Sequence, residues 1–332
     1  MLSTIDAVTA FGDNPSAFLA LSSDKTVFTA PGLAGFVAYR RQGRYLVQFA
    51  GPFAPPADYP ALLGGFLEFA AAQGRRVVAI QLQRADAEVY AGHGFTVNQI
   101  GASYAIRLDG FSLRGGRFVR LRNKISRARR SGLTVEEVSG EDVSGEDVSG
   151  GWGARLTELD RLWLRSKGRH VRPLRFLVGE RTGPLQRHRR LFVARSGEQL
   201  LAYISYSPVG GGQPGWLHDL SRRLQGAPPG VMELVNHTAI ELFRAEGAQW
   251  LHFGFTPFTG LAPGHELACG SRFVTRLVRL LAAHGEAVYP ARTQLAYKEK
   301  WGPHVVLPEY LAFHGRPSLG AVWSLLRTAN IV

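Results

Sequence analysis

Two lysines near the carboxyl end of the chain have the residue type and the spacing to take part in catalysis. Lys298 and Lys300 stand two positions apart in the segment Tyr297–Trp301. In an extended segment both side chains would point to one face, whereas in a helix they would diverge. An ammonium group can stabilise a developing oxyanion or protonate a leaving oxygen. Taken alone, the segment is explained more simply by two exposed lysines that flank Glu299.

Residues 216–260 are the part of the chain around which the other elements can be placed. Strand propensity at 216–220 is followed by a basic loop at 221–230 that ends in proline and glycine. Apolar residues then recur at spacings of three and four through Phe243, which predicts a helix, and residues 249–255 have strand propensity again. This order makes a crossover unit, and it places the loop and the start of the helix where an anionic ligand is favoured.

Residues 110–135 are strongly basic and contain no acidic residue. Their cationic side chains lie along a predicted helix that also carries the apolar residues Phe118, Leu121 and Ile125. A charge run is often a solvated helix face, but like charges at helical spacing repel one another unless an anionic partner is present. The residues predicted to contact the phosphates of a nucleic acid are Arg117, Arg120, Arg122, Lys124, Arg127 and Arg130.

The length and the charge of the chain limit the classes of protein that it can be. Its 332 residues suit two domains, and 45% apolar residues can fill a core in each. The net charge of +13 at pH 7 favours a polyanionic partner, either a nucleic acid or an anionic membrane surface. The single Cys269 excludes an internal disulfide framework, and no apolar run resembles a membrane span or a secretory signal. These features favour a soluble, cytoplasmic protein.

A low-complexity segment divides the chain, because residues 138–150 repeat Val-Ser-Gly-Glu-Asp with little variation. We therefore expect an N-terminal domain at 1–135 that ends in the basic helix, an acidic Gly/Ser repeat linker at 136–150 and a C-terminal domain at 151–332. Strand and helix signals follow in a similar order on both sides of the linker. This order predicts an α/β fold of two duplicated, acyltransferase-like domains with mixed sheets.

Several catalytic classes lack their motifs in this sequence. An acetyltransferase that uses coenzyme A needs a glycine-rich loop to cradle the pyrophosphate, and Gln225–Gly230 instead contains two prolines, which remove backbone donors. No P-loop and no His-Glu-x-x-His helix occurs. His265 and Cys269 have no partners at metal-ligand spacing, so no metal site is predicted.

A set of short motifs resembles the catalytic domain of phosphatidylglycerol lysyltransferases over about residues 25–312. The resemblance is strongest in the C-terminal motifs, and it depends on their order and spacing together. The segments that carry it are Phe111–Leu113, Gly115–Gly116, Leu121–Lys124, Trp163, Phe176–Gly179, Asp219–Arg222, Pro229–Glu233, Phe253–Gly260, Tyr297–Pro303 and Glu309–Ala312.

This resemblance implies a tandem pair of acetyltransferase-like (GNAT-type) folds that takes an amino acid from aminoacyl-tRNA and gives it to an acceptor. The family also includes soluble members that use small molecules as acceptors, such as the seryl transferase of valanimycin biosynthesis. The membrane flippase domain that lipid-modifying members usually carry is not seen in this sequence, and Ser221 replaces an apolar residue of the family motif. We therefore expect the hydroxyl or amine of a small molecule from a natural-product pathway as the acceptor.

Two alternatives stay open. Aminoacylation of phosphatidylglycerol or another membrane lipid would suit the charge and the apolar residues of the tail at 319–332, which would make the protein membrane-peripheral. A helix packed on its own domain would explain the same tail. A non-catalytic RNA-binding protein would explain the basic helix, but it would not need the ordered C-terminal motifs.

The resemblance also implies roles for individual residues. An aminoacyl ester on a ribose hydroxyl is already activated, so transfer needs no cofactor besides the aminoacyl-tRNA co-substrate. Lys298 or Lys300 is expected to be catalytic or to contact the ribose, and the sequence does not separate the two. Asp219 is a third catalytic candidate, because its carboxylate could bind the α-ammonium group of the transferred amino acid, restrain Arg222 or form a local salt bridge.

Further residues are expected to bind the substrates. Arg222 and Arg223 would hold phosphates of the tRNA acceptor arm, since the planar guanidinium suits them. Glu233 lies near a predicted helix start, where it would also complement the helix dipole. The predicted substrate-binding residues are Arg222, Arg223, Glu233, Thr256 and Tyr297, and the six cationic residues of the basic helix are the predicted tRNA contacts.

Overall fold

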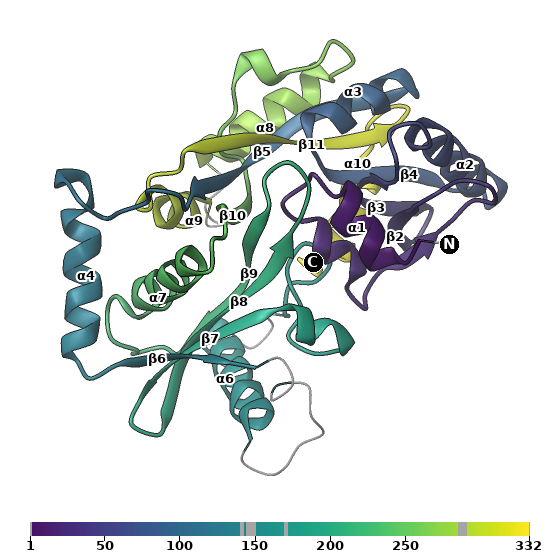
Figure 1. Cartoon of the computed structure of the whole chain (residues 1–332). Helices are drawn as coiled ribbons and strands as arrows, with labels where there is room; N and C mark the ends of the chain where they lie inside the picture. Colours follow the sequence, from purple (N-terminus) through teal and green to yellow (C-terminus); the bar gives the residue numbers. More distant parts are fainter. Residues whose placement is uncertain (1, 140–142, 144–150, 169–171, 285–290, 332) are drawn as a thin grey trace.

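The computed structural model describes residues 2–139, 143, 151–168, 172–284 and 291–331 (Figure 1). The described strands are β1 Thr26–Phe28, β2 Phe36–Gln42, β3 Tyr45–Phe53, β4 Arg76–Leu82, β5 Phe95–Arg107, β6 Thr134–Val138, β7 Arg190–Ser196, β8 Gln199–Val209, β9 Gly215–Arg223, β10 Trp250–Pro257 and β11 Val305–His314. The described α-helices are α1 Thr4–Phe11, α2 Tyr59–Ala72, α3 Arg84–Gly92, α4 Val119–Arg130, α6 Trp152–Lys167, α7 Val231–Ala245, α8 Arg272–His284, α9 Ala291–Glu299 and α10 Leu319–Thr328. The predicted α/β class is confirmed.

Within this part of the chain, eleven strands form one mixed sheet in the order β1-β2-β3-β4-β11-β5-β10-β9-β8-β7-β6. Each half contains the same unit. In the first half β2 and β3 are antiparallel, and α2 crosses over to β4, which is parallel to β3. In the second half β8 and β9 are antiparallel, and α7 crosses over to β10, which is parallel to β9. The predicted duplication is therefore visible in the topology.

The last strand of each half pairs with the other half. Strand β5 of the first half pairs with β10, where Leu251 lies opposite Ile106. Strand β11 of the second half lies between β4 and β5, where Tyr310 lies opposite Leu82. The two halves thus share one sheet through exchanged strands.

The predicted domain boundary falls in a region that the structure covers only in part. Residues 134–138 form β6, which pairs with β7 of the second half. Most of the acidic repeat, residues 140–142 and 144–150, lies outside the described residues. The division into 1–135 and 151–332 remains a prediction.

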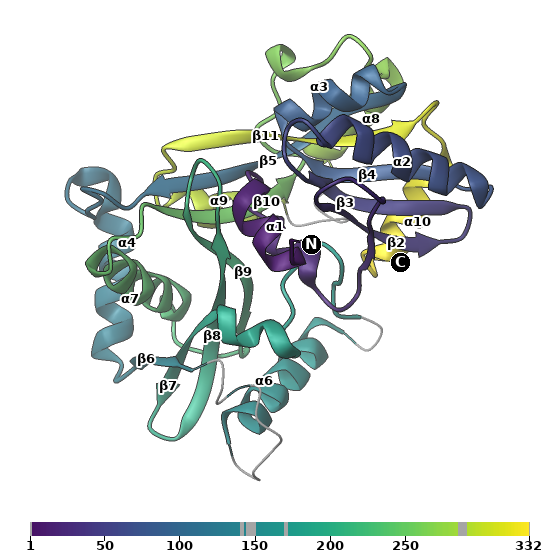
Figure 2. The same ribbon diagram turned by 45° about the vertical axis from the view of Figure 1, so that its right-hand side comes forward.

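Helices cover both faces of the sheet (Figure 2). On one face of the first half, α2 and α3 pack with buried residues that include Phe66 and Tyr90. On the opposite face, α8 and α10 contribute Val274 and Leu325 to a second apolar cluster. In the second half, α4 packs on α7, and Leu121 is among the side chains that the two helices bury. None of the described helices combines the length and the apolarity needed to span a bilayer.

One sequence-based element assignment needs correction. Residues 221–223 continue β9 instead of starting a loop, because Ser221, Arg222 and Arg223 pair with β8. Of the two conformations considered for the segment of Lys298, the structure has the helical one, and α9 ends at Glu299, just before Lys300. The elements α1, β6, α8 and β11 were not predicted.

Candidate active site

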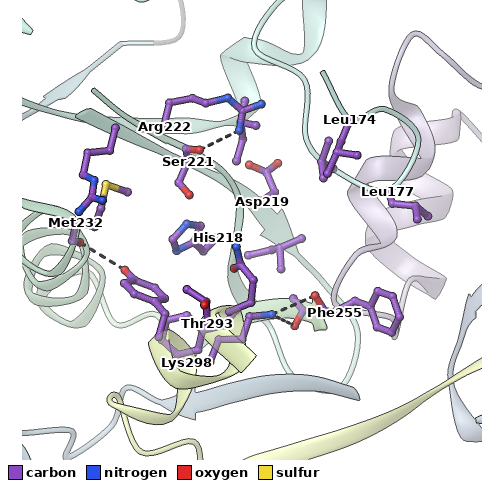
Figure 3. Close-up of a pocket in the computed structure, with 18 of the residues that line it drawn as sticks. Leu174, Leu177, His218, Asp219, Ser221, Arg222, Met232, Phe255, Thr293 and Lys298 are labelled. Atoms are coloured by element: carbon purple, nitrogen blue, oxygen red, sulfur yellow. Dashed lines mark hydrogen bonds between the residues drawn. The ribbon is translucent and has the colours of Figure 1, made fainter. Parts of the chain in front are cut away.

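A cavity of about 580 Å³ lies where strands β9 and β10 meet the N-terminus of α7 and the helix α9 (Figure 3). Helix α6 contributes Trp163 to its wall, and the first half contributes Ser16, Leu19 and Gln81. Sequence analysis missed the first-half residues, because none of them belongs to a recognisable motif. Gln81 does stand out in the structure, since its φ of 57° is unusual for a residue other than glycine.

The cavity exists because two parallel strands separate. β9 and β10 pair only over residues 215–217 and 250–252. Beyond this point Gly254 has a φ of 70°, a conformation that glycine adopts most readily, and the pairing of β10 with β5 shifts register between His252 and Phe255. The carbonyl groups of Gly254 and Phe255 then accept hydrogen bonds from a side chain instead of from a strand.

That side chain is Lys298, which lies in the last turn of α9 and is only 5% exposed. Its Nζ donates to the Gly254 carbonyl oxygen at 2.7 Å and to the Phe255 carbonyl oxygen at 3.1 Å. Burial lowers the pKa of Lys298 to about 7, although the nearby Glu309 opposes this shift. Two N–H groups of Lys298 Nζ donate to these carbonyl oxygens. The remaining position on Nζ holds a third hydrogen in the ammonium form and a lone pair in the neutral amine. Close to neutral pH both forms of the amine are present.

Glu309 is a buried acid behind this lysine that sequence analysis did not select. It lies in β11 and its Oε1 accepts hydrogen bonds from Gln83 Nε2 at 2.9 Å and from the Ser103 hydroxyl. Its Oε2 has no hydrogen-bond partner among the described residues. Burial raises the pKa of Glu309 to about 8 despite these donors and Lys298. The carboxyl group is therefore mostly protonated at neutral pH.

Lys300 points away from Lys298 and takes part in a charge network. Its Nζ lies 2.8 Å from Glu233 Oε1, and Lys124 Nζ of α4 lies 3.4 Å from the same oxygen. Burial alone would raise the pKa of Glu233, but the hydrogen bond and charge of Lys300, with the charge of Lys124, bring the pKa below its ordinary value. Glu233 therefore holds two lysines at the cavity wall, and its place in the first turn of α7 also suits the helix dipole.

The side chain of Asp219 is buried and already has a cationic partner. Asp219 is skipped in the pairing of β9 with β8, so it sits at a bulge. Its carboxylate forms an ion pair with Arg189, and both side chains are almost fully buried. Burial raises the pKa of Asp219, and Arg189 opposes the shift. Of the roles considered for Asp219, the restraint of Arg222 is not seen, because the cationic partner of Asp219 is Arg189, a residue that no local sequence signal links to it.

Arg222 is held from α6 instead. Its guanidinium lies 3.9 Å from the ring centroid of Trp163, and its Nε lies 3.9 Å from Asp160 Oδ1. Arg222 and Arg223 both line the cavity. Together with Lys124, Lys167, Lys298 and Lys300, they make six cationic side chains around it.

The other predicted substrate-binding residues differ in position. Tyr297 lines the cavity, and its hydroxyl donates to the Met232 carbonyl oxygen at 3.4 Å. Burial raises the pKa of Tyr297 and lowers that of the neighbouring His218 to about 3, so both side chains are neutral. Thr256 is fully buried in β10 and is not among the residues that line the cavity.

The six predicted tRNA contacts lie on or just before α4, which runs beside α7 (Figure 1). Leu121, Ile125 and Ala128 face inward, whereas Arg117, Arg120, Lys124, Arg127 and Arg130 are exposed. Arg122 is partly buried and donates to the backbone carbonyls of Leu113 and Gly115. Of the six, Lys124 alone lines the cavity that contains Lys298.

The sequence matches the family model described as phosphatidylglycerol lysyltransferase, C-terminal, over residues 6–313. The chain belongs to this family. An MprF-like domain protein of Mycobacterium tuberculosis is 25% identical over 76% of the chain and 52% of its own length. The phosphatidylglycerol lysyltransferase of Bacillus subtilis is 22% identical over 95% of the chain and 35% of its own length. The chain thus spans about half or less of these relatives.

Solved structures agree with this assignment. The C-terminal domain of a putative lysylphosphatidylglycerol synthetase from Agrobacterium fabrum has a TM-score of 0.76 and 25% identity, covering 97% of this chain and 93% of its own. The structure named L-PGS from Bacillus licheniformis has a TM-score of 0.77 and 21% identity, covering 99% of this chain and 95% of its own. The fold is shared over almost the whole length of both.

Proposed function

We propose that this protein transfers an amino acid from aminoacyl-tRNA to a hydroxyl group in the headgroup of phosphatidylglycerol. The acceptor is taken from the names of the relatives, which point to a lipid more than to the small molecule expected from the sequence. The observation that carries the chemistry is the buried amine of Lys298, held by two carbonyl groups at the opening between β9 and β10.

In the proposed reaction the acceptor hydroxyl oxygen attacks the carbonyl carbon of the aminoacyl ester. Its proton passes to the lone pair of neutral Lys298, and a tetrahedral oxyanion forms. The bond between the carbonyl carbon and the ribose oxygen then breaks, and the ammonium group of Lys298 gives the proton to that oxygen. The products are an aminoacyl ester of the lipid and uncharged tRNA, so one lysine can act first as base and then as acid.

The surroundings of Lys298 suit the charges of this reaction. The N-terminus of α7 carries the positive end of the helix dipole, and Met232 and Glu233 of its first turn line the cavity. The two carboxylates in the lining, Asp219 and Glu233, are already paired with cations. The remaining positive charge favours the oxyanion and the phosphates of both substrates.

The basic helix α4 gives a path for the tRNA. Its exposed arginines lie on the same helix as Lys124. Lys124 lines the cavity and forms an ion pair with Glu233. A tRNA whose backbone contacts α4 would place its acceptor end near Lys298. We therefore assign tRNA binding to Arg117, Arg120, Arg127 and Arg130, and the role of Arg122 to holding the preceding loop.

A transfer assay tests the function. Purified protein is mixed with vesicles containing phosphatidylglycerol and with a pool of tRNA charged with radiolabelled amino acids, and the label is partitioned between organic and aqueous phases. We expect label in the organic phase that disappears when ribonuclease is added first. When cell extract is added to the mixture, label that appears only in an aqueous small molecule would contradict the lipid acceptor. Tight tRNA binding without transfer to any acceptor would contradict the enzymatic function.

A further inference from the structure

Two helices on one face of the first half present apolar side chains to solvent. On α8, Phe273 is 68% exposed and Leu280 is 57% exposed, whereas Val274 and Val278 of the same helix are buried. On α10 and just beyond, Leu319 is 80% exposed, Trp323 is 54% exposed and Ile331 is 42% exposed. These five residues are large apolar side chains that the described part of the chain leaves exposed.

On each helix the exposed apolar residues form a stripe separate from the buried one. Phe273, Leu277 and Leu280 are spaced by four and three residues, which places them on one side of α8. Leu319 and Trp323 are four residues apart on α10. Both helices contribute their buried stripes to the same apolar cluster, and they lie on the opposite side of the sheet from α2 and α3 (Figure 2). The two exposed stripes therefore belong to one face of the molecule.

Arginines accompany both stripes. Arg272, Arg276 and Arg279 are exposed on α8, and Arg316 and Arg327 are exposed at the two ends of α10. Residues 271–284 and 315–331 contain no aspartate or glutamate. One described acid, Glu266, lies 4.0 Å from Arg279. Exposed apolar side chains with cations beside them match the boundary between acyl chains and anionic headgroups.

This face is connected to the cavity. The backbone nitrogen of Arg175 donates to the Ala329 carbonyl oxygen at 3.2 Å, and Asn330 Nδ2 donates to the Pro173 carbonyl oxygen at 2.7 Å. Leu174 lies between these two contacts, is 42% exposed and lines the cavity. The end of α10 thus holds a segment of the cavity rim.

We propose that the outward stripes of α8 and α10, with their arginines, form a docking surface for an anionic lipid bilayer. The proposal rests on the proposed function for its purpose, since a lipid acceptor reaches the cavity only from a membrane. Phe273, Leu280, Leu319 and Trp323 insert among the acyl chains, and Arg272 and Arg276 contact lipid phosphates. The positive charge of this face favours an anionic bilayer over a neutral apolar partner.

Sedimentation with vesicles tests the surface without tRNA or catalysis, so its outcome is independent of the transfer reaction. We expect the wild-type protein to bind vesicles of phosphatidylglycerol and phosphatidylcholine, and to bind pure phosphatidylcholine at least tenfold more weakly. A Phe273→Ser/Leu280→Ser variant and a Leu319→Ser/Trp323→Ser variant should each bind at least tenfold more weakly than wild type. The matched control, Val27→Ser/Leu162→Ser, changes two apolar residues of 41% and 39% exposure elsewhere and should bind like wild type.

Depth of insertion gives a second readout. Lipids brominated in the acyl chains should quench tryptophan fluorescence of the wild type, and the Trp323→Phe variant should lose that part of the quenching. Wild-type vesicle binding in both serine variants would overturn the proposal. A second outcome would also overturn it. The wild-type protein would fail to bind vesicles and would form a dimer in sedimentation equilibrium, and the Phe273→Ser/Leu280→Ser change would dissociate this dimer. A second copy of the chain would then cover the face.

Discussion

At the scale of single residues, the proposed chemistry depends on one amine with an unusual environment, that of Lys298. Replacing Lys298 with methionine keeps an unbranched side chain, shorter by its terminal atom, and removes the amine with its lone pair and proton. We expect transfer to slow by about 100-fold to 10,000-fold, the usual contribution of a general acid or base. Because the pKa of Lys298 is about 7, wild-type transfer should rise with pH through neutrality as the neutral amine forms.

The matched variant for this prediction is Lys300→Met, two positions along the chain. It removes a partner of Glu233 and should slow transfer, but the rise in rate through neutral pH should remain. Initial rates of the transfer assay between pH 5.5 and 8.5 would check both variants. A Lys298→Met enzyme with the wild-type rate, or a wild-type rate that does not change with pH, would contradict the role of Lys298.

Glu309 makes a prediction about stability. Its pKa is raised from 4.5 to about 8, so the folded state binds a proton that the unfolded state releases between these values. The resulting stabilisation is complete below pH 4.5 and is lost as pH rises towards 8, at up to about 1.4 kcal/mol per pH unit. Lys298 acts in the opposite direction, but only from about pH 7 upward.

The Glu309→Gln variant should therefore lose less stability than wild type between pH 5 and pH 8. Chemical denaturation at the two pH values measures this difference. The control Glu88→Gln changes an exposed glutamate that pairs with Arg84, and its pH dependence should follow wild type. If the free energy of unfolding changed equally with pH in wild type and in Glu309→Gln, Glu309 would not hold a proton in the folded state.

The sequence indicated the roles of Lys298 and Glu309 to different degrees. The motif at Tyr297–Pro303 indicates both Lys298 and Lys300, but only their different partners in the structure separate the proposed base from the ion-pair partner of Glu233. Glu309 begins the motif segment Glu309–Ala312 and is the one acid of β11, and these were the available signals for it. The link of Asp219 to Arg189 had no local signal, because the bulge in β9 and the loop before β7 bring them together.

At the scale of elements, the helix α4 carries a prediction about tRNA. Replacing Arg120, Arg127 and Arg130 with alanine leaves the inward residues Leu121 and Ile125 in place, so the fold should be kept. We expect weaker tRNA binding and a salt dependence whose logarithmic slope falls by about 2, from the loss of three phosphate contacts. Filter binding between 50 and 200 mM salt, about the range over which such contacts are lost, measures the slope.

A triple replacement on α8, Arg272→Gln/Arg276→Gln/Arg279→Gln, is the matched control. It removes the same charge from a different helix and should leave the tRNA slope unchanged. Equal losses in both triples would show that tRNA responds only to the net charge of the chain. Such a result would contradict a defined tRNA path along α4.

Elements were predicted best where their pattern was local. The helix α7 and the basic helix α4 followed from apolar spacing, and both are present. The polar residues Ser221–Arg223 predict a loop, whereas in the structure their pairing with β8 makes them the end of β9. Local propensity was outweighed there by the hydrogen bonds of a neighbouring strand.

At the scale of the whole molecule, the exchange of β5 and β11 makes the two halves depend on each other. We expect that residues 1–135 expressed alone are insoluble or aggregated, because β4 and β5 would lack the strand that lies between them. Co-expression with residues 151–332 should restore a soluble complex, which size-exclusion chromatography would detect. A monomeric, cooperatively folded 1–135 fragment would contradict this dependence and support two separable domains.

The predicted duplication was correct for the order of elements, and the exchange of strands was beyond what the sequence could show. Pairing between β11 and β5 depends on contacts more than 200 residues apart in places, such as Phe313 with Thr96. No local periodicity encodes a partner at that distance. The central position of β11 therefore had to come from the structure.

The late position of β11 in the chain also affects how fast the protein can fold. Strand β11 can enter its place between β4 and β5 only after more than 300 residues have been synthesised. Bringing β11 to β4 and β5 closes a long loop, and the entropy cost of this closure comes before the strand contacts that offset it. Until then, two apolar strands in the middle of the sheet have free edges. Folding should accordingly be slow, and the interval before β11 docks is the stage at which the chain is most exposed to aggregation and most in need of chaperones.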